Sequence, residues 1–163
     1  MAIEVSDYIS VAEKLNDFGL KAPQGLSILP RNLATAESVD DLRQHVESDT
    51  VRTLLSQHKI EYVEIFDEHT QPPYLEQYGS EWFGPSLLIS ASLLSENPHV
   101  LAVTLGVITN YLYDWFRGSK EGKVTFDVVL QEPDGSCKRV HYSGPADGLA
   151  AVDKVIEELM SKK

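Results

Sequence analysis

The stretch KVTFDVVLQEPDGSCKRVHYS, residues 123–143, decides the fold because it combines two strand patterns with a turn. Apolar and polar residues alternate along KVTFDVVLQ, which is typical of a strand with one buried face. The segment EPDG supplies the proline and the glycine of a tight turn, and CKRVHYS alternates again. The stretch therefore predicts a β-hairpin.

The register of this hairpin follows from the faces that two turns would produce. A plain four-residue turn pairs Val128 with Arg139 and mixes apolar and charged residues on one face. A three-residue loop with Gly135 in the left-handed conformation pairs Val128 with Val140 and keeps one face apolar. We expect the second register.

A helix is predicted to follow the hairpin. The segment SGPADGLAAVDKVIEELMSKK, residues 143–163, begins a helix at Pro145, and its apolar stripe consists of Leu149, Val152, Ile156 and Leu159. A β-β-α unit of about forty residues cannot hold a core alone. It must dock, and the nearest surface able to receive it is the apolar stretch just upstream.

That upstream stretch, HVLAVTLGVITNYLYDWFRG at residues 99–118, is the most apolar part of the chain. Its uninterrupted apolar part is far shorter than the roughly 20 residues that a membrane span needs. Asn97 with Pro98 and Gly118 mark the boundaries of a helix. We expect a helix buried on most sides, either central in the domain or half covered by another subunit.

The N-terminal part shows weaker patterns. We expect a helix over 7–19, a short strand over 26–29, a helical segment begun by the Ser38–Asp41 pair of SVDDLRQHV, a helix near 49–58 and a strand over 59–66. Residues 67–84 read as a long irregular loop, and 85–94 as a short helix or a buried strand.

These elements predict an α+β fold. The chain of 163 residues suits a single domain. Within it we expect a mixed α/β part at 1–97, the central helix at about 98–117 and the β-β-α unit at 123–163. We find no internal repeat.

The composition narrows the classes of function. A formal net charge of −11 works against the phosphate contacts that dominate nucleic-acid affinity. Cys137 is the single cysteine, so no internal disulfide can form. The first residues carry no signal-peptide pattern. We therefore expect a cytoplasmic protein with no membrane span and little affinity for nucleic acid.

Local motifs do not point to a cofactor, a metal or a catalytic set. The sequence has no glycine-rich phosphate loop, and its five histidines show no metal-ligand spacing with one another or with Cys137. Asp67 and His69, just past a predicted strand, could join Arg31 in a dispersed polar site; a solvated loop is the alternative interpretation.

Two further polar groups lie on the hairpin. The chosen register places Asp127 opposite His141, either as a proton-handling pair or as an ordinary cross-strand pair on the surface. A basic cluster near the connector could bind a small phosphate or could serve solubility; its members are Arg117, Lys120, Lys123, Lys138 and Arg139.

The segment PPYLEQYGSEWFG, residues 72–84, is the strongest candidate for a partner-binding surface. Its aromatic residues are interleaved with acids, which suits a cationic group or a basic peptide. The candidate residues are Tyr74, Tyr78, Trp82, Phe83, Glu76 and Glu81. In the alternative interpretation the rings pack on the core and fix a long connection.

From Val100 to Leu159 the order is an apolar helix ending in Trp-Phe, a connector, a hairpin with a Pro-Asp-Gly turn, Gly-Pro and a helix. This order resembles small accessory domains encoded beside bacterial conflict-system effectors, over about a third of the chain and without a specific motif. We expect a non-catalytic protein-interaction or accessory module of a bacterial multi-protein system. The alternatives are a small-molecule-binding protein or enzyme with a dispersed polar site, and a structural homodimer joined through the long helix.

Overall fold

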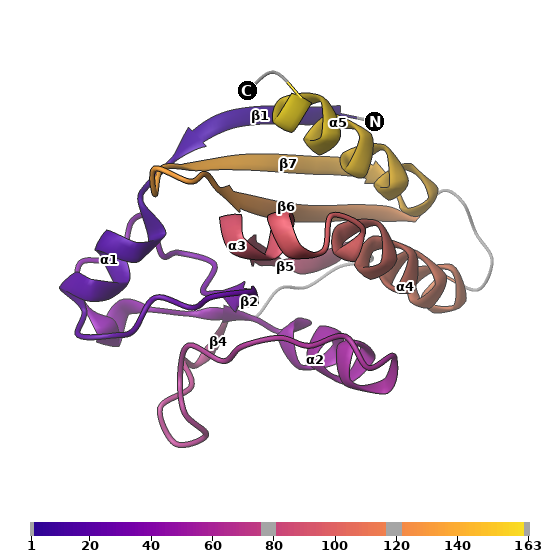
Figure 1. The fold of residues 1–163 in the computed structure, drawn as a ribbon. Coiled ribbons are helices and arrows are strands. Elements are labelled where there is room, and N and C mark those ends of the chain that lie inside the picture. Colours follow the sequence, from indigo (N-terminus) through magenta and orange to yellow (C-terminus); the bar gives the residue numbers. More distant parts are fainter. Residues whose placement is uncertain (1, 76–80, 117–121, 162–163) are drawn as a thin grey trace.

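The predicted hairpin lies at the centre of a five-stranded sheet (Figure 1). Its strands are β6 (Lys123–Gln131) and β7 (Cys137–Pro145). The predicted register is confirmed, because Val128 pairs with Val140 and Asp127 with His141. Gly135 has a φ of +91°, the left-handed conformation that the short loop requires.

The computed structural model describes residues 2–75, 81–116 and 122–161, except the side chains of Met160 and Ser161. The sheet order is β1-β7-β6-β5-β2. The other strands are β1 (Ala2–Tyr8), β2 (Leu26–Leu29) and β5 (Trp82–Ile89). Within this sheet only the β5–β6 pair is parallel, so the sheet is mixed. The fold is α+β, as the sequence predicted.

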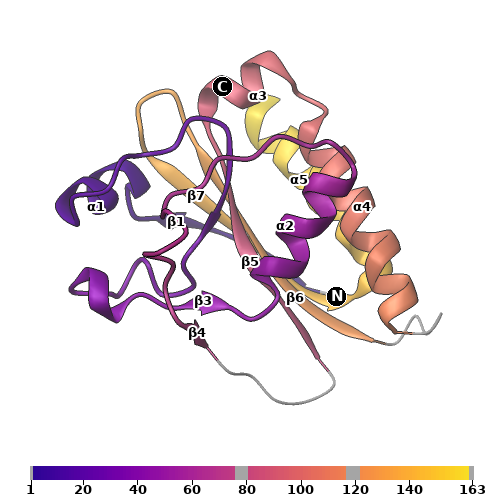
Figure 2. The ribbon, with the colours of Figure 1, turned by 90° about the horizontal axis from the view of Figure 1, so that it is seen from below.

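Helices cover one face of the sheet. In Figure 2 the sheet is seen between these helices on one side and α1 with two short strands on the other. The helices are α2 (Ser48–Gln57), α3 (Ala91–Glu96), α4 (Val100–Trp115) and α5 (Ala150–Ser161). Buried side chains of α4 and α5 pack with the apolar face of the hairpin in one core. The β-β-α unit therefore docks on α4, as expected.

A second core lies on the opposite face of the sheet. It contains Val11 and Leu15 of α1 (Val11–Asp17), together with Leu88, Val129 and Cys137 from the strands. A two-stranded parallel sheet of β3 (Gln44–His45) and β4 (Tyr74–Leu75) lies on this side. This second core fills only part of the face, and the remainder is the cavity described below.

The N-terminal helix prediction was wrong in its first residues. Residues 2–8 form β1, paired with β7 at the edge of the sheet, and the helix begins only at Val11. The burial pattern of β1 is mostly exposed, so the strand lacks the apolar alternation that identifies a half-buried strand. Pairing with β7, rather than side-chain pattern, holds it in the sheet.

One further N-terminal prediction is confirmed in part and another was wrong. The Ser38–Asp41 pair begins a helical segment, with the Asp41 carboxylate accepting from the Ser38 backbone N–H, but this segment is a single 3-10 turn, Val39–Asp41, and the chain then enters β3. Residues 59–66 form no regular strand. Only Val63 donates a backbone hydrogen bond to Leu26, 2.8 Å long, so the segment runs beside β2 without a full ladder. The strand at 26–29 and a helix near 49–58 are confirmed.

The stretch 67–84, predicted to be wholly irregular, contributes β4 and the start of β5. The segment 85–94 combines both of its predicted forms, because β5 ends at Ile89 and α3 follows at once.

Helix α4 is less completely buried than its composition implied. It begins at Val100 with His99 as the N-cap, later than the Asn97–Pro98 pair predicted. Its inner face is buried, but Val103 and Tyr113 are 54% and 44% exposed. Asn110 and Asp114 of the same helix are also exposed; Arg117 and the predicted end at Gly118 lie outside the described residues. No helix in the described part of the chain has both the length and the apolar character needed to cross a bilayer.

Trp82 belongs to the core and is not part of an exposed aromatic surface. It is 1% exposed, and its ring stacks on Phe126 with centroids 6.4 Å apart. A Cβ atom on Gly84 would lie 2.4 Å from the indole, so only glycine leaves room for the ring there. For Trp82, the interpretation in which the ring packs on the core is the correct one.

Trp82→Ala should lower the free energy of unfolding by about 3–5 kcal/mol, because a large buried ring leaves a cavity. Urea denaturation followed by circular dichroism measures this loss. Trp115→Ala is the matched control, since Trp115 is 40% exposed, and it should cost less than about 1 kcal/mol. Equal losses for the two variants would contradict the core assignment.

Candidate functional site

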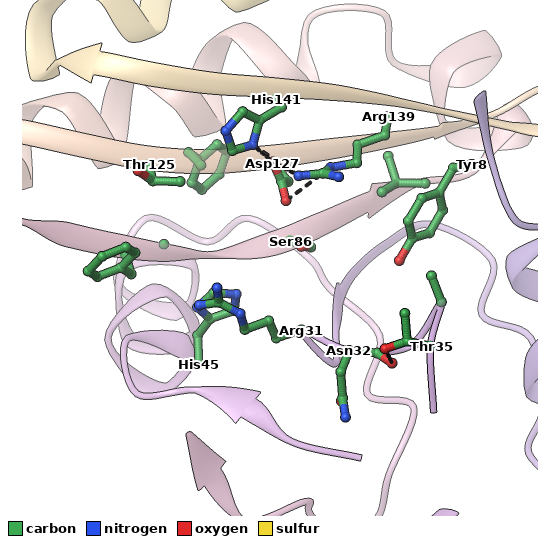
Figure 3. A pocket seen from close by; sticks show the side chains of 15 residues that line it. Tyr8, Arg31, Asn32, Thr35, His45, Ser86, Thr125, Asp127, Arg139 and His141 are labelled. Atoms are coloured by element: carbon green, nitrogen blue, oxygen red, sulfur yellow. Dashed lines mark hydrogen bonds and ion pairs between the residues drawn. The ribbon is translucent and has the colours of Figure 1, made fainter. Parts of the chain in front are cut away.

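A polar cavity of about 250 Å³ lies on the sheet face opposite α4 and α5 (Figure 3). Side chains on the strands form its floor, and the segment between β2 and β3 forms its opposite wall. Its lining residues are Tyr8, Arg31, Asn32, Ala34, Thr35, His45, Phe83, Gly84, Ser86, Thr125, Phe126, Asp127, Val129, Arg139 and His141.

The floor is organised around Asp127, the cross-strand partner of His141. The carboxylate Oδ1 lies 2.5 Å from Nδ1 of His141, and Oδ2 lies 3.3 Å from Nε of Arg139. Nδ1 of His141 also lies 3.1 Å from Nη2 of Arg139, but the contact with Asp127 is the shorter one. Because a carboxylate only accepts hydrogen bonds, we assign a proton to Nδ1, which donates a hydrogen bond to Asp127. Nε2 of this imidazole therefore points away from Asp127, while the charge of Arg139 is balanced locally by the same carboxylate.

A bulge in β5 completes the floor. Phe83 pairs with Thr125 and Ser86 pairs with Asp127. Between these two pairs β5 has two residues and β6 has one, so β5 contains one extra residue. In a regular strand, residues three apart point to opposite faces. The extra residue brings both Phe83 and Ser86 to the cavity, and the Gly84–Pro85 pair, which breaks ladder pairing, occupies the bulge.

The opposite wall is held by hydrogen bonds between its own residues. The Asn32 side chain donates to the carbonyl of Asp41 over 2.7 Å and accepts from the backbone N–H of Arg43 over 2.8 Å. The backbone N–H of Arg31 donates to the carbonyl of Arg43. These bonds join the segment after β2 to the segment before β3. They therefore fix the backbone positions from which the side chains of Arg31 and His45 extend.

His45 is the most unusual residue of the site. Its side chain is only 7% exposed, and its Nδ1 atom is buried with no hydrogen-bond partner among the described residues. The pKa of His45 is lowered to about 4, mainly by burial and also by the nearby charge of Arg31, while Asp127 opposes both. The imidazole is therefore neutral near pH 7, with one donor and one acceptor nitrogen.

Arg31 supplies the cation that the site leaves uncompensated. Its side chain lines the cavity and, in Figure 3, reaches toward His45. No side-chain hydrogen bond or ion pair joins it to any residue in the described ranges. Arg139, by contrast, is paired with Asp127. The arrangement can accept a negatively charged group near Arg31, with hydrogen-bonding atoms of His45 close by.

The structure separates the residues of the predicted aromatic surface. Trp82 is in the core and Phe83 lines the cavity. Tyr74 is exposed and donates its hydroxyl to Asp49, while Glu81 accepts from Thr125. Tyr78 and Glu76 lie outside the described residues. No continuous surface joins the members that are described, and whether any of them contacts a partner stays a prediction.

The predicted polar candidates are also divided. Arg31 lines the cavity, but Asp67 and His69 are exposed in a turn where the Asp67 carboxylate accepts from the His69 backbone N–H, and neither lines the cavity. The Asp127–His141 pair forms as predicted, in a half-buried cavity rather than on an open surface.

The basic cluster does not form one patch in the described part of the chain. Lys138 pairs with Asp7, Lys123 lies 3.8 Å from Glu81, and Arg139 pairs with Asp127. Arg117 and Lys120 lie outside the described residues. Cys137 is buried, and burial raises the pKa of its thiol.

His45 is the site residue that sequence reasoning missed, because it belongs to a two-residue strand whose partner in β4, Leu75, is 30 residues further along the chain. The Gly84–Pro85 pair inside an apolar run was the available signal for the bulge. In the described ranges, no three His, Cys, Asp or Glu side chains gather where they could hold a metal ion.

Comparison with protein-family models, with curated proteins and with solved structures finds no match for this chain.

The buried imidazole makes stability depend on pH. The pKa of His45 is 6.5 in the unfolded chain and about 4 in the fold. Between these values the unfolded state binds a proton that the folded state does not, so the free energy of unfolding falls as pH drops from 6.5 to 4, by up to about 3 kcal/mol. Above pH 6.5 this contribution is absent.

Urea denaturation of wild type and His45→Gln across this range measures the effect as a difference in slope. The variant should lose the part of the pH dependence that His45 supplies. Lys154→Gln, a charge change on α5 on the other side of the sheet, should keep the wild-type slope. Parallel curves for wild type and His45→Gln would rule out a buried neutral imidazole.

Proposed function

We propose that this protein binds a small anionic molecule in the cavity between the sheet and the β2–β3 segment. The observation that carries the proposal is the unsatisfied Nδ1 atom of His45, buried beside the uncompensated guanidinium of Arg31. A buried polar atom without a hydrogen bond costs about 1–3 kcal/mol. A ligand that supplies the missing bond and a negative charge removes that cost.

The charge distribution supports an anion. The chain as a whole has a net charge of −11, yet the cavity lining contains two arginines and one aspartate. A uniformly acidic surface would repel an anion. Here, the Asp127 carboxylate is already engaged by His141 and Arg139, so Arg31 is left to attract one.

The size of the cavity supports a small molecule. A volume of about 250 Å³ is slightly smaller than the roughly 300–1,000 Å³ of most ligand pockets. The mouth is open at the exposed residues Arg31 and Thr35, so a small ligand has a path in. The walls combine ring and methyl groups with a few convergent polar atoms, the composition that such pockets usually have.

Thermal unfolding against a panel of small carboxylates, phosphates and sulfates tests this proposal. A ligand present at a hundred times its Kd adds about 2.7 kcal/mol, which should raise the Tm of a chain of this length by roughly 5–10 °C. Arg31→Gln should abolish most of the shift, because the variant loses the unpaired cation.

Lys154→Gln is the control, since it removes one positive charge on α5, away from the cavity. It should keep the full ligand-induced shift. No shift for wild type with any anion of the panel, or an equal shift in Arg31→Gln, would refute the proposed site.

The exposed apolar residues of α4 favour a second function, a protein-interaction module. Val103 and Tyr113 lie on the outer face of this helix with Ala102 and Gly106, whose small side chains leave the backbone accessible to a partner. Aromatic residues are enriched where interfaces form. In this proposal the outer face of α4 contacts another subunit of a cytoplasmic multi-protein system or a second copy of the chain.

The paired substitution Val103→Ser and Tyr113→Ser tests this second function. Both side chains point outward, so the variant should keep the wild-type Tm within a few degrees while losing association. Light scattering measures self-association, and affinity purification from the host measures a stoichiometric partner. A wild-type protein that is monomeric and recovered alone would exclude this role for α4.

A further inference from the structure

The side chains that line the cavity have one positive charge that is not balanced by a negative one within the described ranges. A ligand with one negative charge would balance it. Arg139 and Asp127 compensate each other at 3.3 Å. His45 is neutral, because burial lowers its pKa to about 4. Arg31 is then the one permanently charged lining group without a counter-charge in the described residues. A single cation matches a single anionic charge.

Carboxylates at the margin of the cavity disfavour a second negative charge. Glu4 is the cross-strand partner of His141 on β1, so its side chain lies on the same face of the sheet. Glu81 accepts a hydrogen bond from Thr125, which lines the cavity, and its nearest cation is Lys123 at 3.8 Å. A dianion would place its second charge among these acids, at a cost in binding.

The geometry of a guanidinium favours a planar partner. Its N–H groups form a fork that binds both oxygens of a carboxylate at once. Arg31 reaches the cavity from the loop after β2, with the imidazole of His45 beside it as a second polar contact. A carboxylate on Arg31 would therefore have a hydrogen-bonding atom of His45 within the same cavity.

Part of the remaining lining is apolar, beside the polar side chains of Asn32, Thr35, Ser86 and Thr125. The ring of Phe83, brought inward by the bulge, lines it together with Tyr8 and Val129. Gly84 adds backbone without a side chain. These groups offer no further charge to a ligand, but they can cover a ring or a short hydrocarbon body.

From these observations we infer that the ligand is a small monocarboxylate, held by Arg31 and His45 with an apolar body against Phe83 and Tyr8. This inference rests on the proposed anion-binding function and narrows it to one chemical class. It excludes phosphate monoesters as preferred ligands.

Isothermal titration of the full chain with matched pairs tests the inference. The monocarboxylates are butyrate, benzoate and phenylacetate; their partners are butyl, phenyl and benzyl phosphate, which are dianions at about pH 7.5. At least one carboxylate should bind, and more tightly than its phosphate partner by about tenfold or more. Phenylacetamide should bind more weakly than phenylacetate, because it lacks the negative charge.

Variants connect the preference to the residues. Arg31→Gln should remove the advantage of phenylacetate over phenylacetamide, whereas Arg31→Lys should retain part of it, since lysine keeps the charge without the fork. Phe83→Ala should weaken phenylacetate more than butyrate, because the larger body touches the ring. Because the Arg31 side chain is exposed, its variants should melt near the wild-type temperature.

The outcomes separate this inference from the function on which it rests. If phosphate monoesters bind as tightly as carboxylates or more so, the monocarboxylate assignment is overturned while the anion site stands. If only sulfates or phosphates of the wider panel bind, the monocarboxylate assignment is likewise overturned and the anion site again stands. If no anion binds and Arg31→Gln behaves like wild type, both are overturned.

Discussion

The register of the β6–β7 hairpin is the constraint on which the rest of the structure depends. Because side chains alternate along a strand, one register sends Val128 and Val140 to the helices and sends Asp127 and His141 to the other face. A slip by one residue would exchange these faces and place a carboxylate in the core. The same pairing therefore stabilises the fold and assembles the floor of the cavity. Stability and the candidate site cannot be altered independently along these two strands.

The cavity exists because the second face of the sheet is only partly covered. Helix α1 and its core close one end, and the loops around β3 close another. Between them the bulge at Gly84–Pro85 turns Phe83 inward, and the hydrogen bonds of Asn32 hold the opposite wall at a fixed place. These are local departures from regular structure. In natural proteins such departures are concentrated at functional sites. There the local sequence preferences and the regular structure disagree, because a particular arrangement of side chains is required.

Sequence patterns predicted the parts that depend on local chemistry. The alternation of 123–143 and the turn at Gly135 gave the hairpin register, and the stripe from Leu149 to Leu159 gave α5. The pairing of Asp127 with His141 on the cavity floor could therefore be predicted from the sequence. The position of His45 could not, because it depends on a two-residue strand pairing with distant β4. Strand β1 was missed for a related reason, since its exposed residues carry no apolar period and only β7 determines its structure.

The position of β1 also sets an order of assembly during synthesis. Asp7 and Lys138, which pair across β1 and β7, are 131 residues apart in the chain. The hairpin and α5, by contrast, close over short distances, and contacts between nearby residues form fastest. During synthesis the β1 segment therefore leaves the ribosome long before β7, the strand with which it pairs, has been made. Until β7 is synthesised, the β1 segment has no strand to pair with. Its residues are mostly exposed in the fold and include acids, so the unpaired segment stays hydrated and is disfavoured from pairing with another chain.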